Sequence, residues 1–147
     1  MREGSAVPIE VNFDPATGVL TGKISGELTL PEYRDVMEQI LASESIPNNA
    51  DTVWDLRAVR LSSINAAWID QFLAYRRSIS DRRRDCRLAY IVSDEMAEIL
   101  THLVSEKGRD IPYDYGIFRS EAEARAWLLS GEDAPPQAAL GRGRAGG

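Results

Sequence analysis

Few residues of the chain could carry out chemistry. His102 is the single histidine and Cys86 the single cysteine, so neither has the partners from which zinc sites and nucleophilic catalytic groups are built. No glycine-rich phosphate loop follows a predicted strand, because the glycines of residues 18–26 have the wrong spacing and lie within a predicted hairpin. We therefore expect a protein that is not an enzyme and that uses no metal and no cofactor.

Polar residues at the predicted ends of strands form a second group of candidates. Asp55 ends a short predicted strand, and in open α/β sheets ligands bind beyond the carboxyl ends of the strands. Such a cluster could bind a small anion or a nucleotide, although strand ends are also polar simply because they meet water. The other residues expected at this edge are Arg57, Ser93, Asp94 and Arg119.

Two serines, Ser62 and Ser63, lie between a predicted strand at residues 52–55 and a predicted helix that begins at Ile64. A hydroxyl in this position can cap the helix by accepting a hydrogen bond from a free backbone N–H. It can also be a phosphorylation site, because the helix N-terminus and nearby arginines would stabilise a phosphate. The sequence favours the cap, and the phosphosite stays open as the second interpretation.

An arginine-rich segment, residues 75–87, overlaps the end of the helix predicted at residues 64–79 and holds six arginines against two aspartates. Cations at a helix C-terminus complement the helix dipole, so the segment is typical of a solvated helix end. A surface that binds a partner is the alternative, because aromatic and arginine side chains anchor many protein interfaces. The residues expected on that surface are Trp68, Phe72, Tyr75, Arg76, Arg82, Arg83 and Arg84.

Periodicity and turn residues predict the elements that position these candidates. Residues 9–13 and 19–25 alternate apolar and polar side chains around a DPATG turn, which predicts an antiparallel hairpin. Thr29 with Glu32, and Ser120 with Glu123, have the spacing of capping boxes that begin helices. Further strands are expected at 52–55, 87–93 and 115–118, and helices at 30–42, 64–79, 94–108 and 120–129.

The helix at residues 94–108 carries an apolar stripe that should face the core. The stripe leaves His102 at its edge, in a surface or rim position. The residues of the stripe are Met96, Ile99, Leu100 and Leu103.

Four strand-then-helix steps with right-handed crossovers predict an α/β fold with a mostly parallel five-stranded sheet and an antiparallel first strand. The expected order is β-β-α-β-α-β-α-β-α. Residues 9–130 should form one domain, with an N-terminal arm at residues 1–8. Residues 131–147 hold mainly glycine, alanine, proline and arginine, too little apolar surface to order a chain, so we expect a flexible tail.

Composition limits the partners. The formal charge of −6 at pH 7 argues against generic nucleic-acid binding, which needs a basic face. No apolar run is long enough to span a bilayer or to form a secretory signal. Because a lone cysteine also fits a reducing compartment, we expect a cytoplasmic protein.

The segments GKISGELTLPEY, VWDLRAV, AYIVSD and FRSEAEARAWL, together with the order of elements over residues 9–129, resemble the STAS superfamily. This superfamily is named for sulfate transporters and anti-sigma factor antagonists, and the likeness is to its small uncharacterised bacterial members. It implies a STAS-like fold and a regulatory role in binding other proteins. In the antagonists a serine after the third strand is phosphorylated. That serine stands in a turn with an acidic residue before it and a glycine after it. In this chain Leu61 and Ile64 stand at those two positions, so the phosphoswitch is expected to be degenerate.

Two functions of different classes follow. The first is a non-enzymatic regulatory or protein-interaction module, which binds a protein partner or associates with itself as a dimer. The second is a module that binds a small ligand or a lipid, with a pocket at the strand ends or beneath the helices. A closed apolar pocket beneath the helices would favour the ligand, and a solid core with an apolar outer patch would favour the partner.

Overall fold

The computed structural model describes residues 9–83 and 85–130. Five strands form one sheet, in which strands adjacent in sequence are also adjacent in space. β1 pairs antiparallel with β2, and the other three pairs are parallel, which confirms the predicted sheet. The strands are β1 (Ile9–Asp14), β2 (Val19–Gly26), β3 (Asp51–Val59), β4 (Cys86–Ile91) and β5 (Tyr113–Phe118).

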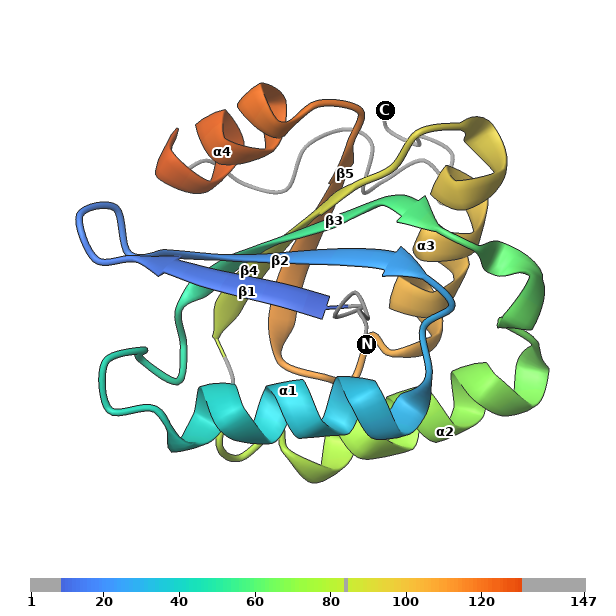
Figure 1. Ribbon diagram of the computed structural model, residues 1–147, viewed down its shortest axis with the longest axis horizontal. Coiled ribbons are helices and arrows are strands. Elements are labelled where there is room, and N and C mark those ends of the chain that lie inside the picture. Colours follow the sequence, from blue (N-terminus) through green and yellow to red (C-terminus); the bar gives the residue numbers. More distant parts are fainter. Residues whose placement is uncertain (1–8, 84, 131–147) are drawn as a thin grey trace, which may run out of the picture.

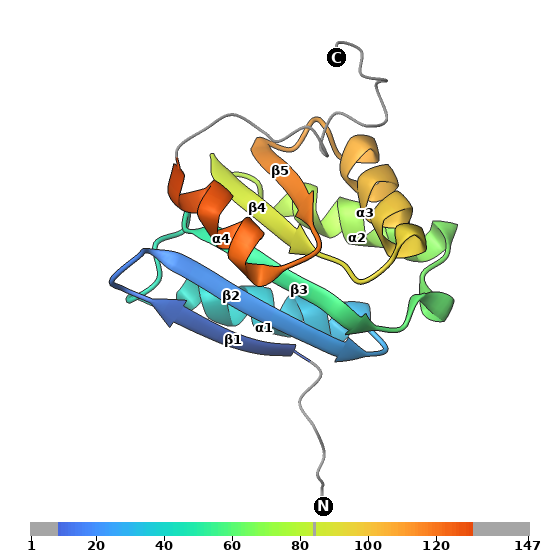
Figure 2. The same cartoon turned by 90° about the horizontal axis from the view of Figure 1, so that it is seen from above.

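Four helices cover the two faces of this sheet. They are α1 (Leu30–Ala42), α2 (Ala66–Ser78), α3 (Glu95–Lys107) and α4 (Glu121–Ser130), and a short 3₁₀ helix, η1 (Leu61–Ser63), precedes α2. Because the strand order never reverses, right-handed crossovers place α1, α2 and α3 on the same face. Figures 1 and 2 show these three helices on one side of the sheet and α4 alone on the other.

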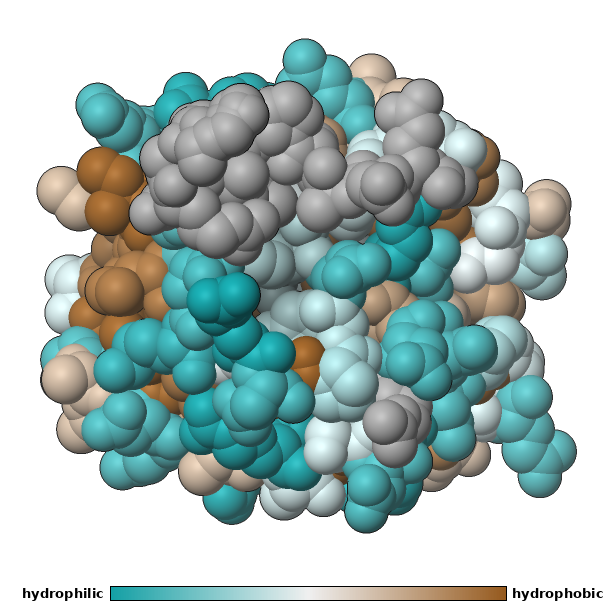
Figure 3. Space-filling view, turned by 180° about the vertical axis from the view of Figure 1, so that it is seen from behind, coloured by the Kyte–Doolittle hydropathy of each residue, from teal (hydrophilic) through white to brown (hydrophobic). Residues whose placement is uncertain are grey.

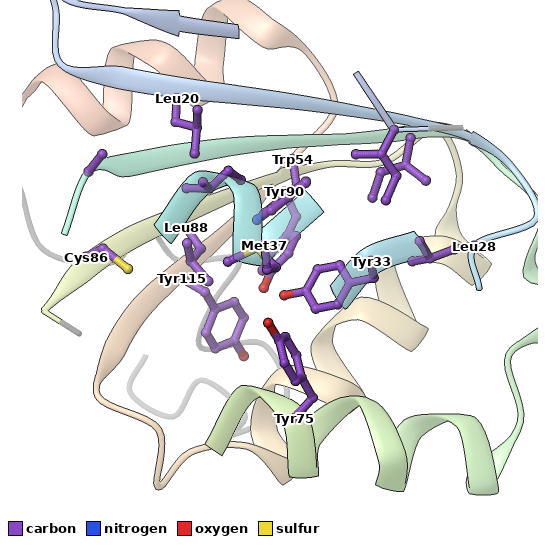
Figure 4. Packing of buried hydrophobic residues seen from close by; sticks show 14 of the residues in the cluster. Leu20, Leu28, Tyr33, Met37, Trp54, Tyr75, Cys86, Leu88, Tyr90 and Tyr115 are labelled. Atoms are coloured by element: carbon purple, nitrogen blue, oxygen red, sulfur yellow. The ribbon is translucent and has the colours of Figure 1, made fainter. Parts of the chain in front are cut away.

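Each face of the sheet has its own core. On the face of α1, Trp54 and Leu88 pack with Tyr33 and Met37 of the helix, as Figure 4 shows. On the opposite face, Trp127 of α4 packs in a smaller cluster with Phe118. The strand residues of the smaller cluster are Val19, Val53, Ala89, Ile91 and Phe118.

The N-cap hydrogen bonds of the two predicted capping boxes form in the structure. The backbone N–H of Glu32 donates to Oγ1 of Thr29 over 3.3 Å, and the Thr29 hydroxyl donates to Glu32 over 2.7 Å. At the start of α4, the N–H of Glu123 donates to Oγ of Ser120 over 3.2 Å. Local capping chemistry therefore begins α1 and α4 where the sequence predicts.

The start of α2 differs from the prediction. Asn65 caps the helix, because its Oδ1 accepts from the N–H of Trp68 over 2.9 Å, and the helix begins at Ala66. Ser62 and Ser63 belong to the preceding η1 turn. The predicted serine cap is therefore wrong. The strand β3 also runs four residues beyond Asp55, to Val59, so the loop that follows it is shorter than expected.

Candidate functional site

A cavity lies between the sheet and the helices α1, α2 and α3. Its volume is about 90 Å³, which corresponds to roughly three water molecules at about 30 Å³ each. Apolar and aromatic side chains form most of the wall. The lining residues are Ile24, Leu28, Tyr33, Trp54, Leu56, Val59, Leu61, Ile64, Trp68, Phe72, Arg76, Tyr90, Ala97, Leu100, Thr101, Val104 and Ser105.

The cavity exists because α3 turns small side chains towards the sheet. Ala97, Thr101 and Ser105 recur every four residues and so share the helix face that lines the cavity. The large side chains Met96 and Ile99 point outward instead, with 65% and 56% of their surfaces exposed. Small residues cannot fill the space beneath a helix, and the space that they leave is the cavity.

The predicted core stripe of α3 is therefore largely wrong. Met96, Ile99 and Leu103 are exposed, and Leu100 is half-buried in the cavity wall. Figure 3 shows apolar side chains gathered on the side of the molecule where Figure 1 places η1 and α3. We call Met96, Ile99 and Leu103 the outer stripe of α3.

Aromatic rings hold the opposite wall of the cavity. Trp68 stacks on Phe72 with ring centres 5.0 Å apart and a tilt of 12°, and Tyr33 lies 5.0 Å from Phe72. The indole N–H of Trp68 donates to the carbonyl oxygen of Leu28 over 3.1 Å, which fixes the ring at the start of α2. These contacts fix one wall of the cavity in place without filling it.

One end of the cavity is polar. Arg76 of α2 is 4% exposed and lines the cavity together with the hydroxyl-bearing Tyr33, Tyr90 and Ser105. Figure 4 shows the hydroxyl ends of Tyr33 and Tyr90 turned towards the space above α2. Burial raises the pKa of both tyrosines, so their hydroxyls stay neutral. The buried end of the cavity thus combines one cation with neutral hydrogen-bonding groups.

The other end of the cavity reaches the surface. Half-buried apolar side chains from the end of β3 and from η1, including Val59 and Leu61, line the cavity there. An apolar rim that leads to a buried polar end is an arrangement that suits a ligand with one apolar and one polar part.

The residues predicted at the strand ends lie elsewhere. Asp55 accepts from Nε and Nη2 of Arg57 over 2.9 and 2.8 Å, and these bonds hold the pKa of Asp55 below its usual value. Side chains alternate along a strand, so Asp55 and Arg57 face α4, whereas Trp54 and Leu56 line the cavity. Asp55 and Arg57 therefore lie on the face of the sheet opposite the cavity.

Two of the three remaining residues of that edge have partners in the chain. Asp94 caps α3 by accepting from the N–H of Ala97 over 2.8 Å, and Arg119 pairs with Glu98 over 2.6 Å. Ser93 is exposed. The strand register brings these positions to one edge, as predicted, because Asp55 is level with Ile91. A ligand site at this edge stays a prediction.

The arginine-rich segment is less solvated than its composition suggests. Arg83 is buried and donates to the carbonyl oxygens of Asn48 and Ala50 and to Oγ1 of Thr52. Arg82 is exposed and pairs with Glu38 over 3.0 Å. Arg83 therefore holds the loop before β3 in place and is not available to a partner.

The predicted partner surface around α2 is correspondingly smaller. Tyr75 and Arg76 are buried, and Trp68 and Phe72 are half-buried in the cavity wall. The hydroxyl of Tyr75 donates to Glu38 over 2.7 Å. Of the seven predicted residues, Arg82 is exposed, and Arg84 lies outside the described residues.

His102 takes part in a polar cluster that the sequence did not predict. The Tyr115 hydroxyl lies 2.8 Å from Nδ1 of His102 and donates to Glu106 over 2.8 Å. Because a hydroxyl has one proton, Nδ1–H of His102 must donate to the Tyr115 oxygen. Within the described residues, no group partners the buried Nε2 of the ring. His102 is half-buried at the edge of α3, in the predicted rim position.

Nothing in the described part of the chain gathers the side chains that bind metals, since no three His, Cys, Asp or Glu residues group there. Cys86 is buried, and burial raises the pKa of its thiol, which disfavours the reactive thiolate. Among the described residues, no helix is long and apolar enough to cross a membrane.

A pocket beneath the helices was one of the two alternatives that the sequence left open, but the residues that line it were not predicted, although one signal pointed to Arg76. Ile69, Leu73 and Arg76 recur at helical spacing, so Arg76 occupies the buried face of α2. An arginine on an apolar stripe indicates a buried cation. The arginines that follow Arg76 in the sequence led instead to the prediction of a basic surface.

Comparisons with known proteins agree with this architecture of a mostly parallel sheet, three helices on one face and one on the other. The chain belongs to the SpoIIAA-like family, whose model matches residues 19–129. The predicted resemblance to small bacterial STAS-like proteins is thus confirmed for family and fold.

One similar solved structure is that of an uncharacterised protein of the DUF3478 family, with a SpoIIAA-like fold, from Shewanella loihica PV-4. The two chains are 20% identical, and the TM-score is 0.58, with 82% of this chain and 91% of the other covered. At this identity the likeness shows the fold alone. No curated protein matches the chain.

Proposed function

We propose that the chain is a non-enzymatic SpoIIAA-like domain that binds a small apolar ligand in the cavity beneath α1, α2 and α3. One observation carries the proposal: Ala97, Thr101 and Ser105 of α3 line the cavity with small side chains, while the outer stripe of the same helix is exposed. A chain selected only for stability would fill this space, because buried cavities cost free energy. Binding of a ligand would offset that free-energy cost.

The proposal is tested by titration with octan-1-ol, with intrinsic fluorescence as the signal. Trp54 and Trp68 line the cavity, so their emission should change on binding. An Ala97→Leu variant places a larger side chain in the cavity and should abolish the change without loss of stability. The matched control is Ala74→Leu, which makes the same change at an exposed position of α2. Equal binding by both variants would contradict the proposal.

A second candidate function is docking of a protein partner or of a second copy of the chain, and the outer stripe of α3 supports it. Met96, Ile99 and Leu103 expose about half or more of their surfaces on consecutive turns of one helix. Exposed apolar patches commonly mark interaction sites. A regulatory role and a cytoplasmic location are part of this second candidate, and phosphorylation at Ser62 or Ser63 stays a prediction within it.

A further inference from the structure

Arg76 differs from Arg83, the other arginine that is buried among the described residues. Within residues 9–83 and 85–130 neither of the two forms an ion pair with a carboxylate. Arg83 donates to three oxygen acceptors, from Asn48, Ala50 and Thr52. Arg76 lies in the cavity wall, where its neighbours are aromatic rings and phenol groups. A buried guanidinium without an anion is costly, so its position calls for a counter-charge.

The surroundings of Arg76 cannot supply that counter-charge. Its guanidinium carbon lies 4.8 Å from the ring centre of Tyr113 and 5.7 Å from that of Phe72. Aromatic faces attract a cation, but they do not neutralise it. The phenol groups of Tyr33 and Tyr90 also interact with Arg76, and burial raises the pKa of both, so they remain uncharged donors and acceptors.

The cavity and this cation are parts of one structure. Arg76 lies in the cavity wall, and among the described residues that line the cavity it is the one charged side chain. The rest of the wall offers apolar surface and a few hydroxyls. A ligand that fits this wall carries a single negative charge at one end and hydrocarbon elsewhere. A guanidinium can bind a carboxylate through two parallel N–H···O bonds, which favours that head group.

We infer that the ligand is a short single-chain amphiphile with one carboxylate, bound with its carboxylate on Arg76 and its alkyl chain along the apolar wall towards the rim. This inference rests on the proposed function, because it names the class of ligand for the same cavity. The cavity of about 90 Å³ has room for roughly three methylene groups if a methylene takes up about the 30 Å³ of a water molecule in the liquid, so a longer alkyl chain extends past the apolar rim. A dianionic phosphate head would leave one of its charges without a partner.

The experiment compares four probes of equal chain length by calorimetric titration at pH 7. They are octanoate, octan-1-ol, octyl phosphate and octyltrimethylammonium. Octanoate should bind about 10- to 100-fold more tightly than octan-1-ol, since a hydrogen bond to a charged group is worth that factor. The ammonium should bind more weakly than the alcohol, because Arg76 repels it. These comparisons use the wild-type chain and so do not depend on whether a variant folds.

Variants of Arg76 then assign the effect to this side chain. Arg76→Met should reduce octanoate binding to the level that octan-1-ol shows with the wild-type chain. Circular dichroism and thermal unfolding check that the variant is folded. Arg76→Lys keeps the charge and should retain part of the preference for octanoate.

Each failure has its own meaning. If octan-1-ol and octanoate bind equally in the wild type, or if Arg76→Met keeps the preference for octanoate, the inference is overturned while the proposed function stands. Tighter binding of octyl phosphate than of octanoate overturns the carboxylate assignment. If none of the four probes binds, both the inference and the proposed function are overturned.

Discussion

The indole ring of Trp54 lies directly against Gly22 of the neighbouring strand. The two residues are paired in the β2–β3 register, and a Cβ atom at residue 22 would come within 2.3 Å of Cζ3 of Trp54. A glycine therefore allows the ring to lie across β2. Because Trp54 also forms part of the cavity wall, this contact links the packing of the sheet to the shape of the cavity.

Replacing Gly22 should test that link. We predict that Gly22→Ala lowers the free energy of unfolding by about 1–3 kcal/mol, since the added methyl group forces the ring to move. The same variant should alter octan-1-ol binding, because Trp54 can move only at the expense of the cavity or the core. Denaturant unfolding and fluorescence titration measure the two effects. Lys23→Ala, an exposed change in the same strand, serves as the control and should leave both quantities near their wild-type values.

The start of α2 gives a second prediction. Asn65→Ala should cost about 1 kcal/mol of stability, because it removes the acceptor for the N–H of Trp68. Ser62→Ala should change stability by less than about 0.5 kcal/mol, since Ser62 is exposed and precedes the helix. Urea unfolding of both variants distinguishes the positions. A larger loss of stability for Ser62→Ala than for Asn65→Ala would mean that Ser62, rather than Asn65, caps α2.

Three helix starts show what the sequence can predict and what it cannot. The caps at Thr29 and Ser120 are correct because the pattern is local: the hydroxyl accepts from the backbone N–H three residues further on, within one turn. At α2 the 3₁₀ turn of η1 moves the helix start from Ile64 to Ala66. The length of β3 determines that shift, and it depends on pairing with β2 rather than on the local pattern.

The same difference between local and non-local information explains why the residues that line the cavity were not predicted. Periodicity predicts that α3 has an apolar stripe, but it does not tell which face another element covers. Residues 96, 99 and 103 form the more apolar face, and the structure exposes it. The less apolar face, with Thr101 and Ser105, lies against the sheet. Hydrophobic patterns assume a filled core, so they assign the wrong face to a helix that borders a cavity.

Arg83 provides a third prediction. Arg83→Met should lower the free energy of unfolding by about 2–4 kcal/mol, because it removes the donor to the carbonyl oxygen of Asn48 and to the buried Oγ1 of Thr52. Arg82→Met should cost less than about 1 kcal/mol, since its pair with Glu38 is exposed. Thermal or denaturant unfolding measures both variants. Similar small losses would mean that Arg83 is a surface residue, as the composition of its segment suggests.

Asp55 and Arg57 give a prediction about pH. The pKa of Asp55 is lowered, chiefly by its hydrogen bonds from Arg57, so the folded chain binds a proton at this site less readily than the unfolded chain. The resulting stability is present above the ordinary aspartate pKa of about 3.9 and is lost as the pH falls through the lower folded value. Asp55→Asn should therefore flatten the stability curve below about pH 4.

The measurement is the free energy of unfolding between pH 7 and pH 2. Arg57→Ala should flatten the same part of the curve, because it removes the donor while the carboxylate remains. If both variants keep the full wild-type slope below pH 4, the Asp55–Arg57 pair does not contribute to acid stability.

The outer stripe of α3 gives the last prediction. An Ile99→Lys, Leu103→Lys double variant should change the free energy of unfolding by less than about 1 kcal/mol, since both side chains are largely exposed. If the stripe joins two copies of the chain, sedimentation should show that the variant remains monomeric at concentrations where the wild type associates. The matched control is Leu129→Lys, because Leu129 is similarly exposed but lies on α4, across the sheet. If Leu129→Lys abolishes association and the α3 variant retains it, the interface lies on the opposite face of the sheet. If the wild type stays monomeric at every concentration, the stripe does not join two copies of the chain, and docking of a different partner is the remaining role.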